Sequence, residues 1–200
     1  THSIPTALDA PSARALSAAL RRMPALRALE LRHVTLSNAS AAALFGAEGA
    51  APGLRSLTID SAHLAPTAAR ALAATGWRLE ELDLFYNPKL GAAGLAALLA
   101  APTFALRRLD LDYCGLDAAA LLAVANAPWP LEELYLLQND FSAAEAGPAL
   151  VALSRHARLR KLVLDDCLLR AAGFKALVEA TWPALTHLST RGARVEFFGP

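Results

Sequence analysis

The sequence has little cysteine, few aromatic residues and almost no net charge. Only 2 of its 200 residues are cysteine and 6% are aromatic, while 19 basic side chains offset 18 acidic ones to leave a charge of +1. A balanced charge offers no general electrostatic attraction for nucleic acid or for an anionic membrane. We therefore expect neither as a partner.

Long hydrophobic runs and clustered cysteines are also missing. The longest apolar stretches, such as residues 91–104, are alanine-rich, interrupted by Gly and Pro, and shorter than the roughly 20 residues that a membrane span needs. Cys114 and Cys167 lie far apart, and neither belongs to a CxxC or Cys/His spacing. We expect reduced, structural thiols and no transmembrane helix.

What the sequence does contain is a repeat. One pattern begins seven times at intervals of 25 to 28 residues. It reads LxxLxL, followed by two residues, a small or polar residue, one more residue and an aliphatic one. Such self-similarity is typical of a solenoid, in which each unit buries its apolar face only against its neighbours. The pattern begins at Leu26, Leu54, Leu79, Leu106, Leu131, Leu159 and Leu185.

Each unit is expected to open with a short strand. Alternate side chains of a strand point to the same face, so the first, fourth and sixth positions, such as Leu106, Leu109 and Leu111, are expected to point inward. At the ninth position the chain leaves the strand, and the buried backbone there needs a compact or hydrogen-bonding neighbour. The ninth-position residues are Val34, Ala62, Asn87, Cys114, Asn139, Cys167 and Ala193.

Helices are expected between the strands, where alanine and leucine recur at helical spacing. Ser40, Asp117, and Ser142 with Glu145 three residues later are expected to begin three of them. A helix-like stretch at residues 12–23 precedes the first unit and is interpreted as the helix of a partial repeat. The other predicted helices cover residues 67–74, 92–101, 117–127 and 171–180.

The segment Asn87-Pro-Lys-Leu90-Gly91-Ala-Ala-Gly94-Leu-Ala-Ala-Leu resembles the strand-to-helix signature of the ribonuclease-inhibitor-like class of leucine-rich repeats. The resemblance covers roughly residues 26–195. It implies an α/β fold, a right-handed solenoid or horseshoe of about seven repeats, with a parallel concave sheet and convex helices. It also implies an intracellular, cytoplasmic protein used mainly for protein binding.

A single domain is therefore expected over residues 1–200. Residues 1–25 form an N-terminal flank or partial repeat, residues 26–195 form the repeats, and residues 196–200 form the C-terminal end.

On the concave face, the second and third positions alternate in charge from one repeat to the next. Neighbouring strands should therefore pair opposite charges. One interpretation is a charged stripe for a partner; the favoured one is a ladder that satisfies itself and sets the register of the strands. The alternating pairs are Glu80 and Glu81, Arg107 and Arg108, Glu132 and Glu133, and Arg160 and Lys161.

The fifth, seventh and eighth positions gather aromatic and acidic residues that are expected to face solvent. Exposed aromatic groups rimmed by charge are typical of binding patches. Burial by the curvature of the solenoid, or cover by a flanking domain, is the alternative. The predicted partner-binding residues are Asp60, Asp83, Phe85, Tyr86, Asp110, Asp112, Tyr113, Tyr135, Leu137, Asp165 and Asp166.

No residue pattern indicates catalysis. The five histidines are scattered over different repeats, and no nucleophile lies in a recognisable catalytic context. Asp110 and Asp112, with Asp165 and Asp166, suggest a cation site but lack further oxygen ligands. We therefore expect no enzyme activity, no cofactor and no metal.

The sequence favours a monomeric protein-interaction module or scaffold, the recognition segment of a larger intracellular protein. Its partner is expected to be a protein with a basic contact edge, because the patch is acidic. Two alternatives remain: a purely structural spacer, and a GTPase-activating regulator that would use Arg32, Asn87 or Asn139.

Overall fold

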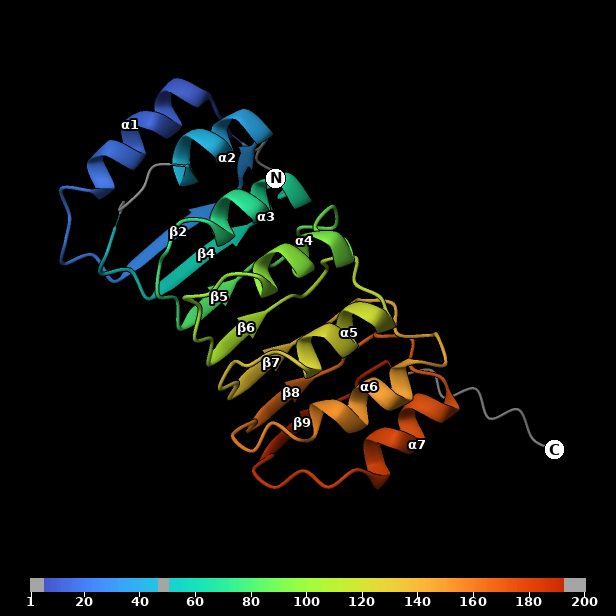
Figure 1. Cartoon of the computed structure of the whole chain (residues 1–200). Helices are drawn as coiled ribbons and strands as arrows, with labels where there is room; N and C mark the ends of the chain where they lie inside the picture. The colour runs from blue at the N-terminus through green and yellow to red at the C-terminus, as the bar shows by residue number, and fades with distance from the viewer. Residues whose placement is uncertain (1–5, 47–50, 193–200) are drawn as a thin grey trace.

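The chain forms a solenoid of alternating strands and helices in a computed structural model that describes residues 6–46 and 51–192 (Figure 1). The strands are β1 (Thr6–Leu8), β2 (Ala28–Arg32), β3 (Val34–Leu36), β4 (Ser56–Asp60), β5 (Glu81–Asp83), β6 (Arg108–Asp110), β7 (Glu133–Tyr135), β8 (Lys161–Val163) and β9 (His187–Ser189). The helices are α1 (Ala10–Leu20), α2 (Asn38–Phe45), α3 (Pro66–Ala73), α4 (Gly91–Leu99), α5 (Ala118–Ala125), α6 (Ala146–Leu153) and α7 (Ala171–Glu179).

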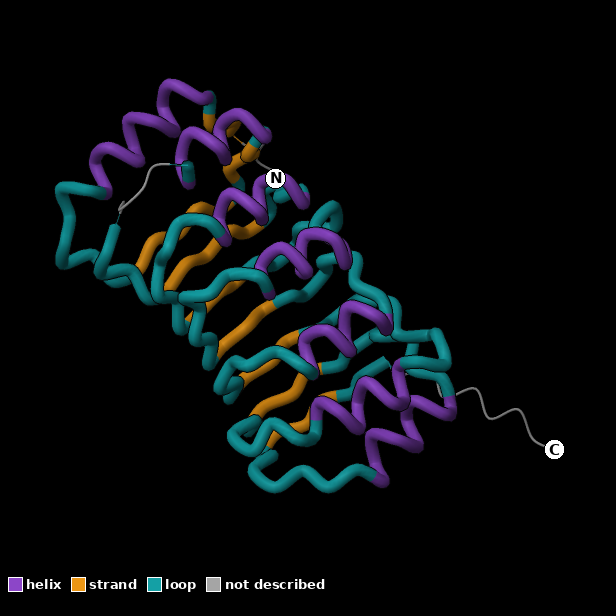
Figure 2. The backbone as a smooth tube through the Cα atoms, in the orientation of Figure 1, coloured by secondary structure: helices purple, strands orange, loops and turns teal. Residues whose placement is uncertain are grey.

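One sheet runs the length of the solenoid. It has seven strands in the order β2-β4-β5-β6-β7-β8-β9, and every pair is parallel. The register places the fourth position of each repeat opposite the fourth position of the next, as with Leu82, Leu109 and Leu134. The helices cover one side of this sheet, which confirms the predicted α/β solenoid (Figure 2).

The core follows the predicted inward positions. Leu106, Leu109 and Leu111 have no exposed surface, because the helices pack over this side of the sheet. Burial is weaker in the last described repeat, where Leu188 is 43% exposed.

The N-terminal segment adds a helix outside the main sheet. Strand β1 pairs with β3 in a separate two-stranded sheet, and α1 packs beside α2. The helix predicted over residues 12–23 is thus present as α1, two to three residues earlier. The predicted C-terminal end at residues 196–200 and the ninth-position Ala193 lie outside the described residues.

The asparagines at the ninth position bridge neighbouring repeats, as their chemistry predicts. The Asn139 amide donates to the carbonyl oxygens of Leu111 at 2.9 Å and Leu136 at 2.8 Å, and its oxygen accepts from the Leu116 N–H at 2.9 Å. Asn87 repeats this arrangement two repeats earlier. Both asparagines are buried, so they replace water as partners of buried backbone groups.

The cysteines take the same position in the alternate repeats. Cys114 donates from Sγ to the carbonyl of Leu84 at 3.1 Å, and Cys167 donates to the carbonyl of Leu136 at 2.8 Å. Both are free and buried, and burial raises the pKa of Cys167 to about 12. They are therefore protonated structural donors, which confirms the prediction from their spacing.

Replacing Cys114 with Ser is expected to lower the free energy of unfolding by about 1 kcal/mol. The hydroxyl can still donate to Leu84, but it is smaller and more polar than a thiol in a fully buried site. Urea unfolding of the two proteins measures the difference. A stability equal to that of the wild type would mean that the thiol contributes nothing beyond its hydrogen bond.

Two of the predicted helix starts are wrong. Ser37, rather than Ser40, caps α2 by accepting from the Ser40 N–H at 3.1 Å. Helix α6 begins at Ala146 instead of following Ser142, because Pro148 lacks an N–H and is tolerated only in the first turn of a helix. The Asp117 cap is confirmed, with its carboxylate accepting from the Ala120 N–H at 2.8 Å.

Candidate functional site

The side of the sheet that faces away from the helices is called here the open face. It carries the second, third, fifth, seventh and eighth positions of the repeats. Its rows at the second and third positions form the predicted charge ladder only in part. Among the described residues, the step from Arg107 and Arg108 to Glu132 and Glu133 is present, whereas the steps from Glu80 and Glu81 to Arg107 and Arg108, and from Glu132 and Glu133 to Arg160 and Lys161, have no ion pair within 4.0 Å. The ion pairs are Arg55 with Glu80 at 3.5 Å, Arg107 with Glu132, and Arg108 with Glu133 at 3.1 Å.

Tyr135 lies within this ladder and is already fully engaged. Its hydroxyl donates to Glu133 at 2.8 Å, while Arg108 and Lys161 lie over its ring at 4.6 and 4.9 Å from the centroid. The sequence grouped Tyr135 with the other exposed aromatics. The structure instead separates it from them, because the fifth position lies next to the charged third-position row.

Phe85, Tyr86 and Tyr113 form one cluster on the open face, called here the aromatic trio. The centroid of Tyr113 lies 5.7 Å from that of Phe85 and 5.6 Å from that of Tyr86, and the Phe85 and Tyr86 centroids are 6.2 Å apart. Tyr86 is 50% exposed, whereas Phe85 and Tyr113 are half-buried. The structure thus brings these three predicted residues together at the surface.

The two tyrosines of the trio have an unusual backbone. Position eight has a positive φ in every repeat: 54° at Tyr86, 55° at Tyr113, and 68° at Gly192 in the seventh repeat. An aromatic residue rarely adopts this left-handed conformation, which favours Gly, Asn and Asp. The sequence interpretation missed it, although the glycine at the equivalent position 192 was a signal. The remaining position-eight residues with positive φ are His33, Ser61, Gln138 and Asp166.

The aspartates beside the trio are less exposed than predicted. Asp60 is 7% exposed, and Asp110 and Asp112 are each 8% exposed. The expectation that these three carboxylates form a solvated rim is therefore wrong. Side chains on neighbouring strands are close enough to cover so short a side chain, and the carboxylates of Asp110 and Asp112 are held against the backbone.

Several aspartates of the open face accept hydrogen bonds from backbone N–H groups that the sheet does not pair. Asp83 accepts from the Phe85 N–H at 3.0 Å, and Asp110 accepts from the Asp112 N–H at 3.1 Å. Asp112 accepts from the Leu137 N–H on the next repeat at 2.7 Å. The aspartates thus satisfy seventh-position N–H groups where the short strands end.

The remaining predicted residues lie along the same rows. Asp165 accepts from the Arg191 N–H at 2.7 Å and from the Ser189 hydroxyl at 2.6 Å. Asp60 pairs with Arg32 at 3.3 Å. Leu137 is half-buried and Asp166 is exposed.

Burial makes the central carboxylates reluctant to ionise. Desolvation, followed by repulsion from Asp112, raises the pKa of Asp110 to about 7. Desolvation also raises the pKa of Asp112 to about 6, with Asp83 and Asp165 adding further repulsion. Asp83, Asp110, Asp112 and Asp165 are called here the acidic strip; within residues 6–46 and 51–192, none of the four has an ion-pair partner within 4.0 Å.

The residues considered for other chemistry are differently placed. Asn87 and Asn139 are buried and committed to backbone hydrogen bonds, so neither is aimed at a nucleotide. Arg32 is bonded to Glu30 at 2.9 Å and to Asp60. In the described part of the chain, no three or more His, Cys, Asp or Glu side chains form a group that could hold a metal ion.

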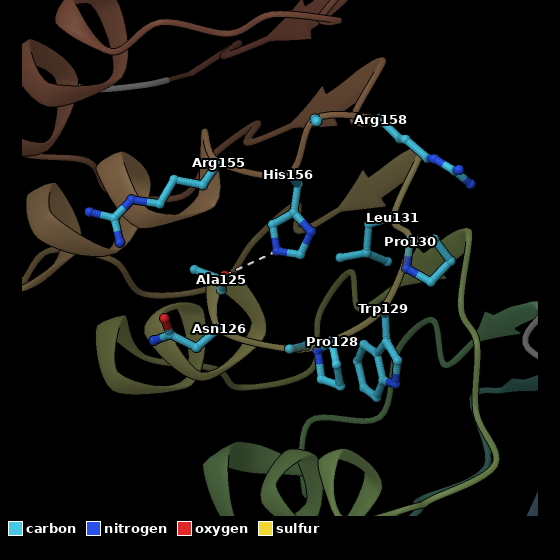
Figure 3. A pocket seen from close by; sticks show the side chains of 11 residues that line it. Ala125, Asn126, Pro128, Trp129, Pro130, Leu131, Arg155, His156 and Arg158 are labelled. Carbon is cyan, nitrogen blue, oxygen red and sulfur yellow. Dashed lines mark hydrogen bonds between the residues drawn. The ribbon is translucent and has the colours of Figure 1, made fainter.

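A cavity of about 370 Å³ lies away from the open face, between the loops that follow α5 and α6 (Figure 3). His156 points into it and lies 3.0 Å from the carbonyl of Ala125 through Nε2, opposite Trp129. Arg155 and Arg158 extend away from its centre (Figure 3). Their guanidinium groups do not converge there, so this cavity lacks the arrangement of an anion site.

Comparison with known proteins identifies a longer relative. No known family's sequence profile matches the chain. The chain is 34% identical to a Tonsoku-like protein of Bos taurus over 193 residues, which cover 89% of this chain and 14% of that protein. The chain spans only a small part of the length of this relative.

None of the helices within residues 6–46 and 51–192 has both the length and the apolar character needed to cross a bilayer.

Proposed function

We propose that the chain is a protein-interaction module that binds a protein partner through its open face, centred on the aromatic trio. The half-exposed Tyr86, in contact with Tyr113 and Phe85, is the observation that carries this proposal. Tyrosine is enriched in the hot spots of protein interfaces, where it combines apolar area with a polar tip.

The finer assignment follows from the repeat pattern. The chain is a module of the ribonuclease-inhibitor-like class of leucine-rich repeats and acts as the recognition segment of a larger intracellular protein. The short match within a much longer relative supports the idea of a segment. The free, buried cysteines fit a reducing compartment.

The left-handed backbone at Tyr86 and Tyr113 favours a binding role for these residues over a purely structural one. A tyrosine at a left-handed position costs of order 1 kcal/mol or more, and two adjacent repeats carry this cost at Tyr86 and Tyr113. Neither ring is buried enough to recover it in the core. Contact with a partner would give both rings the burial that they lack in the free chain.

The test compares the wild type with a Tyr86→Asn, Tyr113→Asn double variant. Asparagine tolerates the left-handed backbone, so the fold is expected to persist while the aromatic surface is lost. A partner captured from cell extract, identified and purified, is expected to bind the variant at least tenfold more weakly, since hot-spot tyrosines contribute about 2 kcal/mol or more.

Val178→Asn is the matched control. Val178 is 60% exposed on α7, on the helix side of the solenoid, and the change also replaces an exposed apolar side chain with an amide. Circular dichroism checks that all the variants are folded. Equal binding by the wild type and the double variant would refute the aromatic trio as the binding site and would place the contact elsewhere on the chain.

A further inference from the structure

The open face already shows how this chain holds a cation against a tyrosine. Arg108 and Lys161 approach the Tyr135 ring from neighbouring strands, and Glu133 lies beside both the Tyr135 hydroxyl and Arg108. Cations are attracted to the face of an aromatic ring, and a nearby carboxylate adds to that attraction. Tyr135 is thus an aromatic and acidic site that the chain's own basic residues fill.

The aromatic trio has the same components without the cation. Within residues 6–46 and 51–192, no arginine or lysine lies over the rings of Phe85, Tyr86 or Tyr113, in contrast to the two that lie over Tyr135. The three rings contact one another at angles of 33° to 67°, so they present faces in more than one direction.

The aspartates of the acidic strip beside the trio also lack direct ion pairs in the described part of the chain, although Arg108 acts on Asp110 and Asp112 from beyond ion-pair distance. At the second and third positions of the open face, acidic and basic side chains pair with each other. The acidic strip has no such pairing in the part of the chain that the structure describes. Asp112 directly precedes Tyr113 and belongs to the repeat next to that of Phe85, so its negative charge borders the rings.

We infer that the aromatic trio and the acidic strip together receive an arginine or lysine side chain of the partner protein, with the cation stacked on the rings of Tyr86 and Tyr113. The carboxylates of Asp83 and Asp112 supply the opposite charge. This inference rests on the proposed function and specifies the chemistry of the partner. Desolvation first, and then repulsion between the aspartates, raises the pKa values of Asp110 and Asp112, and a cation bound beside them would favour their ionised forms.

The probe is a capped pentapeptide, Gly-Gly-Arg-Gly-Gly, compared with the same peptide carrying citrulline. Citrulline has nearly the shape of arginine but no charge. The chain has only three tyrosines, so tyrosine labelling gives three sets of ring signals in an NMR titration. Tyr→Phe variants assign them.

The arginine peptide is expected to shift the Tyr86 and Tyr113 signals saturably and to bind about tenfold more tightly than the citrulline peptide. Tyr135 is the internal control, because its ring is already occupied by Arg108 and Lys161. Equal binding of the two peptides, equal shifts at Tyr135, or no saturable shift would overturn the inference.

Asp112→Asn tests the role of the carboxylate, since the amide oxygen can still accept from the Leu137 N–H. It is expected to weaken the arginine peptide severalfold and to leave the citrulline peptide unchanged. Glu179→Gln removes a charge from the exposed end of α7 and is expected to change neither. If Glu179→Gln weakens binding as much as Asp112→Asn, the attraction belongs to the whole molecule and not to this site.

The outcomes separate this inference from the proposed function. If a partner binds through Tyr86 and Tyr113 but the arginine peptide binds no better than the citrulline peptide, the interaction module stands and the cation site falls. If the arginine peptide binds selectively but the partner is indifferent to the double variant, the cation site stands and the proposed partner-binding role falls.

Discussion

Replacing Asn139 with Ala is expected to lower the free energy of unfolding by about 3 to 5 kcal/mol. The buried amide connects the backbone of neighbouring repeats through Leu111, Leu116 and Leu136. Alanine would leave the Leu111 carbonyl and the Leu116 N–H without this partner, whereas the Leu136 carbonyl would still accept from the Cys167 thiol. Each such buried group costs about 1 to 3 kcal/mol, although water entering the space recovers part of the loss.

Urea unfolding followed by circular dichroism measures this effect. Asn126→Ala is the matched control, because Asn126 is exposed and its side chain bonds to the carbonyl of Leu122 at the end of its own helix. It is expected to cost less than about 1 kcal/mol. A similar cost for both variants would mean that the ninth-position asparagine is not a special support of the fold.

The slope of the unfolding curve is expected to change as well. A solenoid is stabilised by contacts between neighbouring repeats, and weakening one interface can uncouple the two halves of the array. Asn139 lies near the middle of the described repeats, so its loss is expected to make the transition shallower as well as earlier.

The periodicity of the sequence was sufficient to predict the core. Because a strand alternates its side chains, the leucines of each LxxLxL unit had to point inward, and Leu109 and Leu134 are fully buried. The charge ladder was predictable for the same reason: equal registers place Arg108 opposite Glu133.

The aspartates could not be placed by the same argument. Alternation assigns a residue to a face of the sheet, but it does not say how deeply its neighbours cover it. Asp110 and Asp112 are on the open face, as predicted, yet they are nearly buried because they bond to backbone N–H groups of the short strands. That burial depends on side chains of adjacent repeats, which lie about 25 residues away in the sequence.

The separation of Tyr135 from the aromatic trio has a similar origin. All four aromatic residues occupy outward positions, but Tyr135 lies at the fifth position and Tyr86 and Tyr113 at the eighth. The left-handed backbone at position eight directs the side chains away from the regular strand pattern. The alternation of side chains along a strand therefore predicts on which face of the sheet a residue lies, but not which residues of that face contact one another.

Replacing Asp110 with Asn is expected to stabilise the protein at pH 8 and to have little effect at pH 4. The folded-state pKa of Asp110 is raised from 3.8 to about 7, mainly by burial, so the folded protein holds a proton that the unfolded chain releases. Asp110 therefore does not change the free energy of unfolding below about pH 4. It lowers that free energy progressively between pH 4 and 7, and its destabilising effect is complete above pH 7.

The expected gain for Asp110→Asn at pH 8 is on the order of 2 to 4 kcal/mol, because a tenfold change in proton affinity between the folded and unfolded states corresponds to about 1.4 kcal/mol. The amide has no charge to bury, and its oxygen can still accept from the Asp112 N–H. The measurement is urea unfolding of both proteins at pH 4 and pH 8, and the quantity of interest is the change in their stability difference between the two pH values.

The difference between the two proteins cancels the contribution of every titrating group whose pKa the substitution leaves unaltered. Asp83, Asp112 and Arg108 act on Asp110 directly, so their contributions do not cancel completely. Asp166→Asn is the matched control, because it removes the same charge from an exposed position and is expected to show a much smaller change. If Asp110→Asn is no more stable than the wild type at pH 8, the Asp110 carboxylate is compensated in the folded state. The acidic strip would then not be the source of unrelieved negative charge that attracts a cationic partner.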